Sequence, residues 1–126
     1  KMLAKLIVND DQKLAKANSI IHPVLAESFI AWCRERAHHP IVAIDAAVLL
    51  EAGFEQHVDH VLMVFAEKET RVQRVIERDG ASRALAEARM QHQIPEEEKI
   101  QRADFVIYND GRLSLIQQVT EILMKL

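Results

Sequence analysis

Three arginines recur along the chain at a spacing that places them on one face of a helix. Arg71, Arg74 and Arg78 occupy positions i, i+3 and i+7 of a pattern that ends at Asp79-Gly80. A row of guanidinium groups offers paired donors and fixed positive charge, which suits the oxygens of a phosphate dianion. Acidic residues occur on the same stretch. Considered without further context, the three arginines are therefore more commonly explained as part of a solvated, salt-bridged helix face.

The polar stretch that follows carries more basic side chains, Arg83, Arg89, Lys99 and Arg102. It separates two apolar runs of the chain. A mobile lid over an anionic ligand can be inserted at such a place.

A second group of polar residues follows an apolar run at 41–44. Asp45 and Glu51 come after this run, with Leu49 and Leu50 between them. In open α/β sheets ligands bind at the carboxyl ends of parallel strands. Glu51 can therefore accept hydrogen bonds from a substrate while the two leucines form an apolar wall. An ordinary strand-to-helix connection, in which Asp45 caps the next turn, explains these residues equally well.

The histidines do not indicate a metal site. His22 stands alone before Pro23, where a structural role is the more common one. His38 and His39, even with Cys33 nearby, lack the second pair of ligands that a closed zinc site needs. No G-x-S-x-G motif and no recognisable Ser/His/Asp grouping occurs, so the sequence predicts neither a bound metal nor a hydrolase.

The elements that must position these residues alternate between strands and helices. Short apolar runs predict strands at 41–44, 61–65 and 105–108. Helical patterns occur at 68–78, 82–92 and 96–102 and again after Asp110-Gly111, and the N-terminal part predicts two helices separated by Pro23. This order predicts an α/β fold with a parallel sheet. Since no repeat or linker interrupts the chain, residues 1–126 are expected to form a single domain.

Composition excludes several classes of function. The chain has 126 residues, of which 49% are hydrophobic and 28% charged, as is typical of one globular domain. Its formal charge of -3 is too balanced for a duplex-binding module, and its apolar runs are too short to cross a bilayer. One cysteine and the absence of a signal segment favour a cytoplasmic location. We therefore expect neither nucleic acid nor a membrane as a partner.

Several spaced motifs together resemble the dephospho-coenzyme A kinases. They read R-x-x-x-R-D-G-A-S from Arg74, A-R-x-x-x-Q-I-P from Ala88 and A-D-F-V-I-x-N-x-G from Ala103. Upstream, Ile21-His22-Pro23 and the segment from Asp45 to Gly53 are similar to two further elements of that family. Ala47 stands where most bacterial members have proline, and the 44–53 segment looks closer to the kinase half of the bifunctional coenzyme A synthases of animals.

The resemblance implies a P-loop NTPase-like parallel sheet flanked by helices. It implies a helical acceptor-binding part at 1–39, a core at 40–66 and 103–126, and a lid at 67–102. The reaction implied is transfer of the γ-phosphoryl group of ATP, used with Mg²⁺, to the ribose 3′-hydroxyl of dephospho-coenzyme A. Coenzyme A and ADP are then the products, and the partners are small-molecule substrates.

The resemblance also implies a role for particular residues. The catalytic residues are Arg78 and Arg74, and those that bind nucleotide are Asn109, Gly111 and Arg78. The acceptor is held by His22, Asp45, Leu49, Leu50 and Glu51. Arg89, Gln93 and Lys99 belong to the lid.

The phosphate loop of the family has no counterpart in this sequence. Gly53, Gly80 and Gly111 are too far apart for a phosphate loop. The family's phosphate loop and catalytic aspartate precede every motif matched here. We therefore expect an N-terminally truncated kinase fold, in which upstream residues or a partner supply the strand of the phosphate loop. The 126 residues alone are expected to be inactive. The alternative function is an inactive kinase fragment that binds coenzyme A or nucleotide or serves in assembly.

Overall fold

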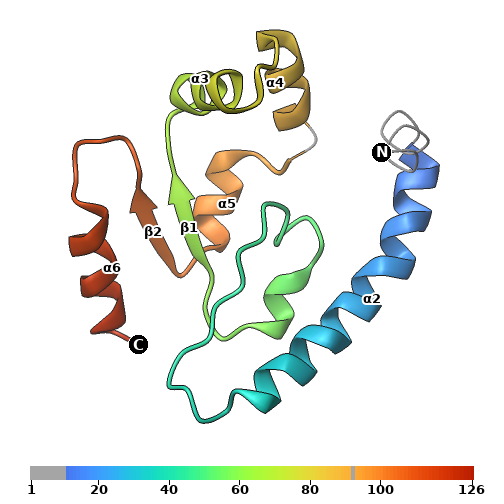
Figure 1. Ribbon diagram of the computed structural model, residues 1–126, viewed down its shortest axis with the longest axis vertical. Coiled ribbons are helices and arrows are strands. Elements are labelled where there is room, and N and C mark those ends of the chain that lie inside the picture. The colour runs from blue at the N-terminus through green and yellow to red at the C-terminus, as the bar shows by residue number, and fades with distance from the viewer. Residues whose placement is uncertain (1–10, 92) are drawn as a thin grey trace. The chain divides into compact units, whose positions relative to one another are not determined.

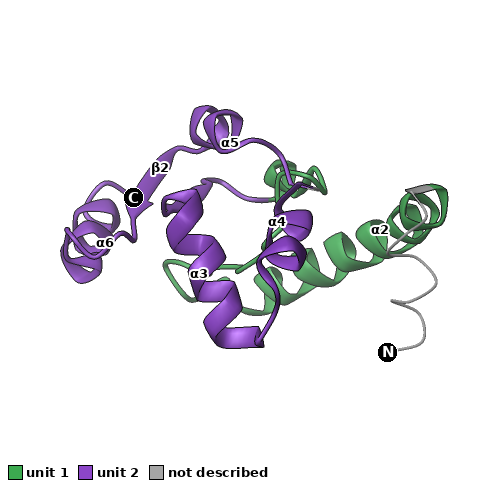
Figure 2. Ribbon diagram, turned by 90° about the horizontal axis from the view of Figure 1, so that it is seen from above, with its two compact units in different colours: residues 1–57 green, residues 58–126 purple. Residues whose placement is uncertain are grey.

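The computed structural model describes residues 11–91 and 93–126. It divides into two compact units, residues 1–57 and residues 58–126, coloured green and purple in Figure 2. The division falls inside the predicted core segment 40–66. The first ten residues of the predicted acceptor-binding part and the last residue of the helix predicted over 82–92 lie outside the described residues. The single-domain organisation stays a prediction.

The described part of the first unit contains one long helix, α2 (Asp11–Glu35). Pro23 lies inside this helix, so the prediction of two helices separated by Pro23 is wrong. A proline removes one main-chain donor and disfavours a helix interior. Here the hydroxyls of Ser19 and Ser28 donate to the carbonyl oxygens of Lys16 and Val24, within the same helix on either side of the proline. The helical patterns before and after Pro23 continue as one helix.

The segment after α2 does not form the predicted strand at 41–44. Residues 41–46 have no regular secondary structure, and Ile41 is 48% exposed. A β-strand exists only where a neighbouring strand pairs with it. Among the described residues the only two strands pair with each other, so 41–44 has no partner there. The prediction of a strand at 41–44 is therefore wrong.

The core of the first unit forms around η1 (Phe54–His57), a short 3-10 helix. Phe54 is 4% exposed, and its ring lies 5.5 Å from that of Phe29 on α2. Leu50 and Ala26 are also buried. Turns over 47–53 end at Gly53, whose φ of 63° is a left-handed conformation that favours glycine. This turn brings Phe54 onto α2.

The second unit contains a parallel sheet of two strands, β1 (Leu62–Phe65) and β2 (Phe105–Tyr108). Leu62 pairs with Phe105 and Phe65 with Tyr108. Three helices connect the strands: α3 (Lys68–Asp79), α4 (Arg83–Gln91) and α5 (Glu96–Arg102). The last helix, α6 (Leu115–Leu123), contacts β2. In Figure 1, α3 and α4 lie beyond the arrowheads of the strands, so they stand at the carboxyl ends of the sheet. The predicted α/β class and the elements from residue 61 onward are confirmed.

Arg71 connects three elements of the second unit. Its Nε donates to the carbonyl oxygen of Ala66, just after β1, at 3.0 Å. Its Nη1 lies 2.8 Å from Oε1 of Glu96, the first residue of α5. Both side chains are half-buried, 24% and 22% exposed. Arg71 therefore fixes the start of α3 against the end of β1 and the start of α5.

Gln118 of α6 holds the last residue of β2 by two hydrogen bonds. Its Oε1 accepts from the main-chain nitrogen of Tyr108 at 2.9 Å, and its Nε2 donates to the carbonyl oxygen of the same residue at 3.1 Å.

Among the helices in the described part of the chain, none combines the length and apolar character that a bilayer span requires.

Replacing Gln118 with alanine is expected to lower the free energy of unfolding by about 1 kcal/mol, because two main-chain groups lose their partners. Urea denaturation of the full-length protein measures the change. Gln117→Ala is the matched control, since the Gln117 amide donates to Glu121 along the same helix and not to the sheet. Its effect is expected within about 0.5 kcal/mol. Equal losses in the two variants would contradict the assigned role of Gln118.

Candidate functional site

The site predicted for the second unit begins with a contact between two of its residues. Arg74 lies on the middle of α3, and its Nη2 donates to the carbonyl oxygen of Asn109 at 2.9 Å. The main-chain nitrogen of Asn109 donates to Phe65 at 2.7 Å, so Asn109 continues the pairing of β2 with β1. One predicted catalytic residue and one predicted nucleotide-binding residue thus lie in contact at the carboxyl ends of the strands.

The turn after Asn109 has a conformation that requires its glycine. Gly111 has a φ of 82°, and the Asp110 carboxylate accepts a hydrogen bond from the main-chain nitrogen of Arg112 at 2.9 Å. Side chains with a Cβ rarely adopt this φ. The Asn109–Gly111 turn is therefore held in one shape next to Arg74.

Arg78 and Arg89 both bind Asp79. Arg78 donates through Nε to Oδ1 at 2.7 Å and through Nη2 to Oδ2 at 3.1 Å. Arg89, on α4, donates through Nη1 to Oδ2 at 2.9 Å. The arginine side chains remain exposed, 74% and 55% respectively. Gly80 follows in the left-handed conformation and ends α3 by donating to Ile76, which allows the chain to turn into α4.

These contacts lower the pKa of Asp79 to about 2, first through the hydrogen bond from Arg78 and second through that from Arg89. Carbon-13 NMR of the Asp79 carboxyl in the full-length protein is expected to show a midpoint near pH 2. Arg89→Gln is expected to raise this midpoint, and Arg83→Gln to leave it unchanged. A midpoint at the ordinary aspartate value in the parent protein would contradict the geometry.

The lowered pKa also sets the sign of a pH effect on stability. Above about pH 4 the carboxyl is ionised in the folded and unfolded states, and its ion pairs contribute in full. As the pH falls from about 4 to about 2, the unfolded state takes up the proton first, so this contribution is lost.

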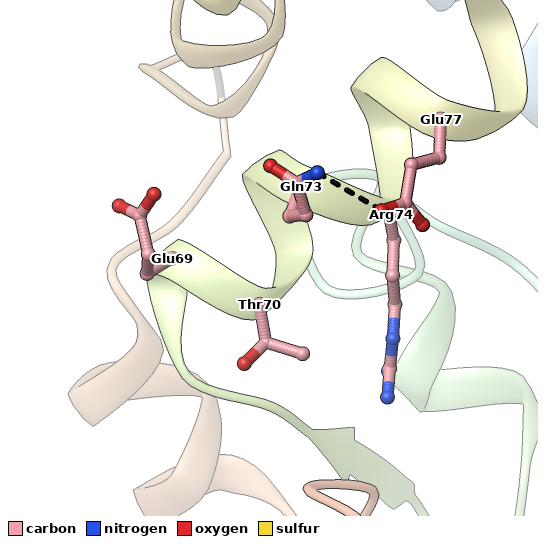
Figure 3. Close-up of a pocket in the computed structure, with 5 residues that line it drawn as sticks. All are labelled: Glu69, Thr70, Gln73, Arg74 and Glu77. Atoms are coloured by element: carbon pink, nitrogen blue, oxygen red, sulfur yellow. Dashed lines mark hydrogen bonds between the residues drawn. The ribbon is translucent and has the colours of Figure 1, made fainter.

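Two shallow depressions flank Arg74 on α3. One has a volume of 510 Å³ and is lined by Arg74, Val75, Glu77 and Arg78. The other has a volume of 420 Å³ and is lined by Glu69, Thr70, Gln73, Arg74 and Glu77. Figure 3 shows the second depression, with Gln73 donating to Glu77 at 2.9 Å and the Arg74 side chain extending away from this pair. Two arginines and one carboxylate line the first depression, whereas one arginine and two carboxylates line the second, so the first suits an anion better.

Two other predicted lid residues contact each other, Gln93 in the connection after α4 and Lys99 on α5. The Nζ of Lys99 donates to Oε1 of Gln93 at 3.4 Å, and both side chains are partly buried. Arg89 is separate from this pair and belongs to the Asp79 cluster. Arg89, Gln93 and Lys99 therefore do not form one continuous basic surface.

The predicted acceptor residues all belong to the first unit. His22 lies within α2 and is half-buried, whereas Asp45 is exposed in the loop after it. Leu50 is 8% exposed and belongs to the core, and Leu49 and Glu51 are half-buried in the same turn. Burial of Leu50 explains its apolar character without a ligand. The acceptor roles of these five residues stay a prediction.

The three arginines of the sequence pattern do not form a common row of donors. Arg71 points to Ala66 and Glu96, Arg74 to Asn109, and Arg78 to Asp79. Periodicity indicates a shared helix face but cannot indicate partners that lie far away in the sequence. The sequence motifs include Asp79 next to Gly80 but do not indicate that Arg78 and Arg89 both bind it.

The fold, together with the cluster of Arg78, Arg89 and Asp79, defines an α/β protein whose parallel strands are joined by a helical, arginine-rich insertion. A family model described as dephospho-CoA kinase matches residues 1–114. The chain belongs to the dephospho-CoA kinase family.

Individual relatives agree with this assignment. A dephospho-CoA kinase of Bacteroides fragilis is 38% identical over 122 residues, covering 97% of this chain and 60% of the relative. One of Geobacter sulfurreducens is 41% identical over 114 residues, covering 88% of this chain and 57% of the relative. The crystal structure of TT1252 from Thermus thermophilus superposes with a TM-score of 0.85 at 32% identity, covering 98% of this chain and 64% of that one. The chain thus spans about 60% of the length of the curated relatives it matches.

Proposed function

We propose that this chain forms part of an enzyme that transfers the γ-phosphoryl group of ATP to the ribose 3′-hydroxyl of dephospho-coenzyme A, with coenzyme A and ADP as products. The observation that supports it is the hydrogen bond from Arg74 to Asn109 in a member of this family. This contact joins a residue proposed to meet the transferring phosphoryl group with a residue proposed to bind the nucleotide.

The arginines of the second unit would stabilise negative charge on the nucleotide. Arg78 uses Nε and Nη2 to bind Asp79, which leaves its Nη1 and its exposed face to bind a phosphate oxygen. Phosphoryl transfer places little covalent demand on a protein, so positioned positive charge is the main contribution that side chains make. Arg74 would act from the neighbouring turn of the same helix.

The remaining parts of the reaction need residues beyond these. Within the part of the chain that the structure describes, no three His, Cys, Asp or Glu side chains are grouped to hold a metal ion. Mg²⁺ would accompany ATP. The acceptor would be held by the first unit, through His22, Asp45, Leu49, Leu50 and Glu51. A cytoplasmic location belongs to the same proposal.

The test is turnover by the full-length protein. ADP release is measured with ATP and one of three acceptors, namely dephospho-coenzyme A, adenosine or AMP, and the product is identified by mass spectrometry. Of the three acceptors, we expect only dephospho-coenzyme A to support ADP release from ATP. The expected product is heavier than dephospho-coenzyme A by one phosphoryl group. Turnover with the nucleosidic acceptors instead would assign another kinase activity. Calorimetric binding of the substrates without ADP release would support an inactive binding protein.

A further inference from the structure

Asp79 is the point at which two elements of the lid meet. It ends α3, and it binds one arginine from its own helix and one from α4. The Nη2 of Arg78 and the Nη1 of Arg89 both contact the same oxygen, Oδ2, at 3.1 and 2.9 Å. The two cationic nitrogen atoms can therefore be separated by no more than the sum of these distances.

Two guanidinium groups at such a separation repel each other unless an anion lies between them. The Asp79 carboxylate is that anion in the described residues. Both guanidinium groups still face solvent and keep donors that Asp79 does not use. A guanidinium group offers five donors in a fixed plane, so orientation by Asp79 also determines where the remaining donors point.

We propose that Asp79 is a positioning residue that holds Arg78 and Arg89 together so that both donate to one anionic group of the bound nucleotide. This inference rests on the proposed function. Asp79 would not contact the nucleotide itself; it would act through the two arginines. Without it, the two positive charges would separate and each would bind a phosphate oxygen alone.

A role limited to holding α3 against α4 is distinguishable, because a second ion pair joins these helices. Arg83 at the start of α4 binds Glu69 near the start of α3 through both terminal nitrogens, at 2.7 and 2.6 Å. Arg83 and Arg89 are similarly exposed, 53% and 55%, and both pairs join α3 to α4, but the Glu69 pair includes neither Arg78 nor Arg89. Arg83→Gln, which breaks this second ion pair between α3 and α4, is therefore the control for loss of the contact between the helices.

The experiment uses the full-length protein and two measurements, steady-state kinetics and calorimetric binding of ATP. Asp79→Asn keeps the side-chain shape and removes the charge. We expect its kcat/KM for ATP and its affinity for ATP each to fall about tenfold, a size typical of lost charged hydrogen bonds. The KM of Asp79→Asn for dephospho-coenzyme A is expected to stay within about twofold of the parent value. Arg83→Gln is expected to match the parent in ATP kinetics and ATP affinity, and Asp79→Glu to recover most of the loss.

A double-mutant cycle supplies the decisive measurement. If Asp79 acts through Arg89, then Asp79→Asn causes a much smaller further loss in an Arg89→Gln background than in the parent. Full multiplication of the two losses would overturn the proposal, as would unchanged ATP kinetics and binding in Asp79→Asn. A parent protein that binds ATP without transferring phosphoryl would refute the proposed function alone, because the binding cycle still tests Asp79. A parent that does not bind ATP would overturn both.

Discussion

Replacing Arg78 with alanine is expected to lower the kcat of the full-length protein by about 10²- to 10³-fold. An arginine that neutralises charge on a transferring phosphoryl group contributes at least that much in other phosphoryl-transfer enzymes. Arg78 is 74% exposed and binds only Asp79 among the contacts described, so its removal leaves the fold intact. Steady-state kinetics with ATP and dephospho-coenzyme A measures the change.

Two further variants separate charge from geometry. Arg78→Lys keeps the charge but loses the planar pair of donors, so an intermediate fall of about tenfold is expected. Arg83→Gln removes an exposed arginine of the adjacent helix and should leave kcat within about twofold. If Arg78→Ala retained the parent kcat, the catalytic assignment of Arg78 would be wrong. A loss of kcat in Arg83→Gln instead would point to Arg83.

Replacing Arg71 with alanine is expected to destabilise the protein by about 2–3 kcal/mol. The substitution removes a half-buried ion pair with Glu96 and a hydrogen bond to Ala66, and it leaves the Glu96 carboxylate without this partner. Urea denaturation of the full-length protein gives the free energy of unfolding.

The control for Arg71 is again Arg83→Gln. Arg83 makes ion pairs at similar distances with Glu69 and Glu87, but its side chain is 53% exposed. Exposed ion pairs contribute less than about 1 kcal/mol because water and salt screen them. If the two variants lost the same stability, burial of the Arg71 contacts would not matter and our interpretation of Arg71 would be wrong.

The sequence predicted the second unit well and the first unit poorly, for a physical reason. The strands at β1 and β2 and the helices between them follow from short-range patterns, and each strand finds its partner within this chain. The run at 41–44 has an equally good strand pattern, but pairing depends on a neighbour that the described residues do not contain. Periodicity therefore indicated a strand where the structure has none.

The same distinction applies to the candidate site. Arg74 and Asn109 were singled out from motifs, and their contact across 35 positions of the chain is consistent with a shared site. Periodicity also grouped Arg71 with Arg74 and Arg78, although the contacts of Arg71 are structural. The convergence of Arg89 on Asp79 depends on how α4 turns back on α3, which no local pattern encodes.

The hydrogen bonds of Gln118 have a consequence for how this sheet can grow. Phe105 and Asn109 donate main-chain hydrogen bonds toward β1, so by alternation Val106 and Tyr108 face the opposite border. Gln118 already satisfies both main-chain groups of Tyr108, which leaves little of that border open to strand addition. A strand that joins at this border would have to displace Gln118 from Tyr108. The glutamine thereby disfavours pairing of this end of β2 with another molecule.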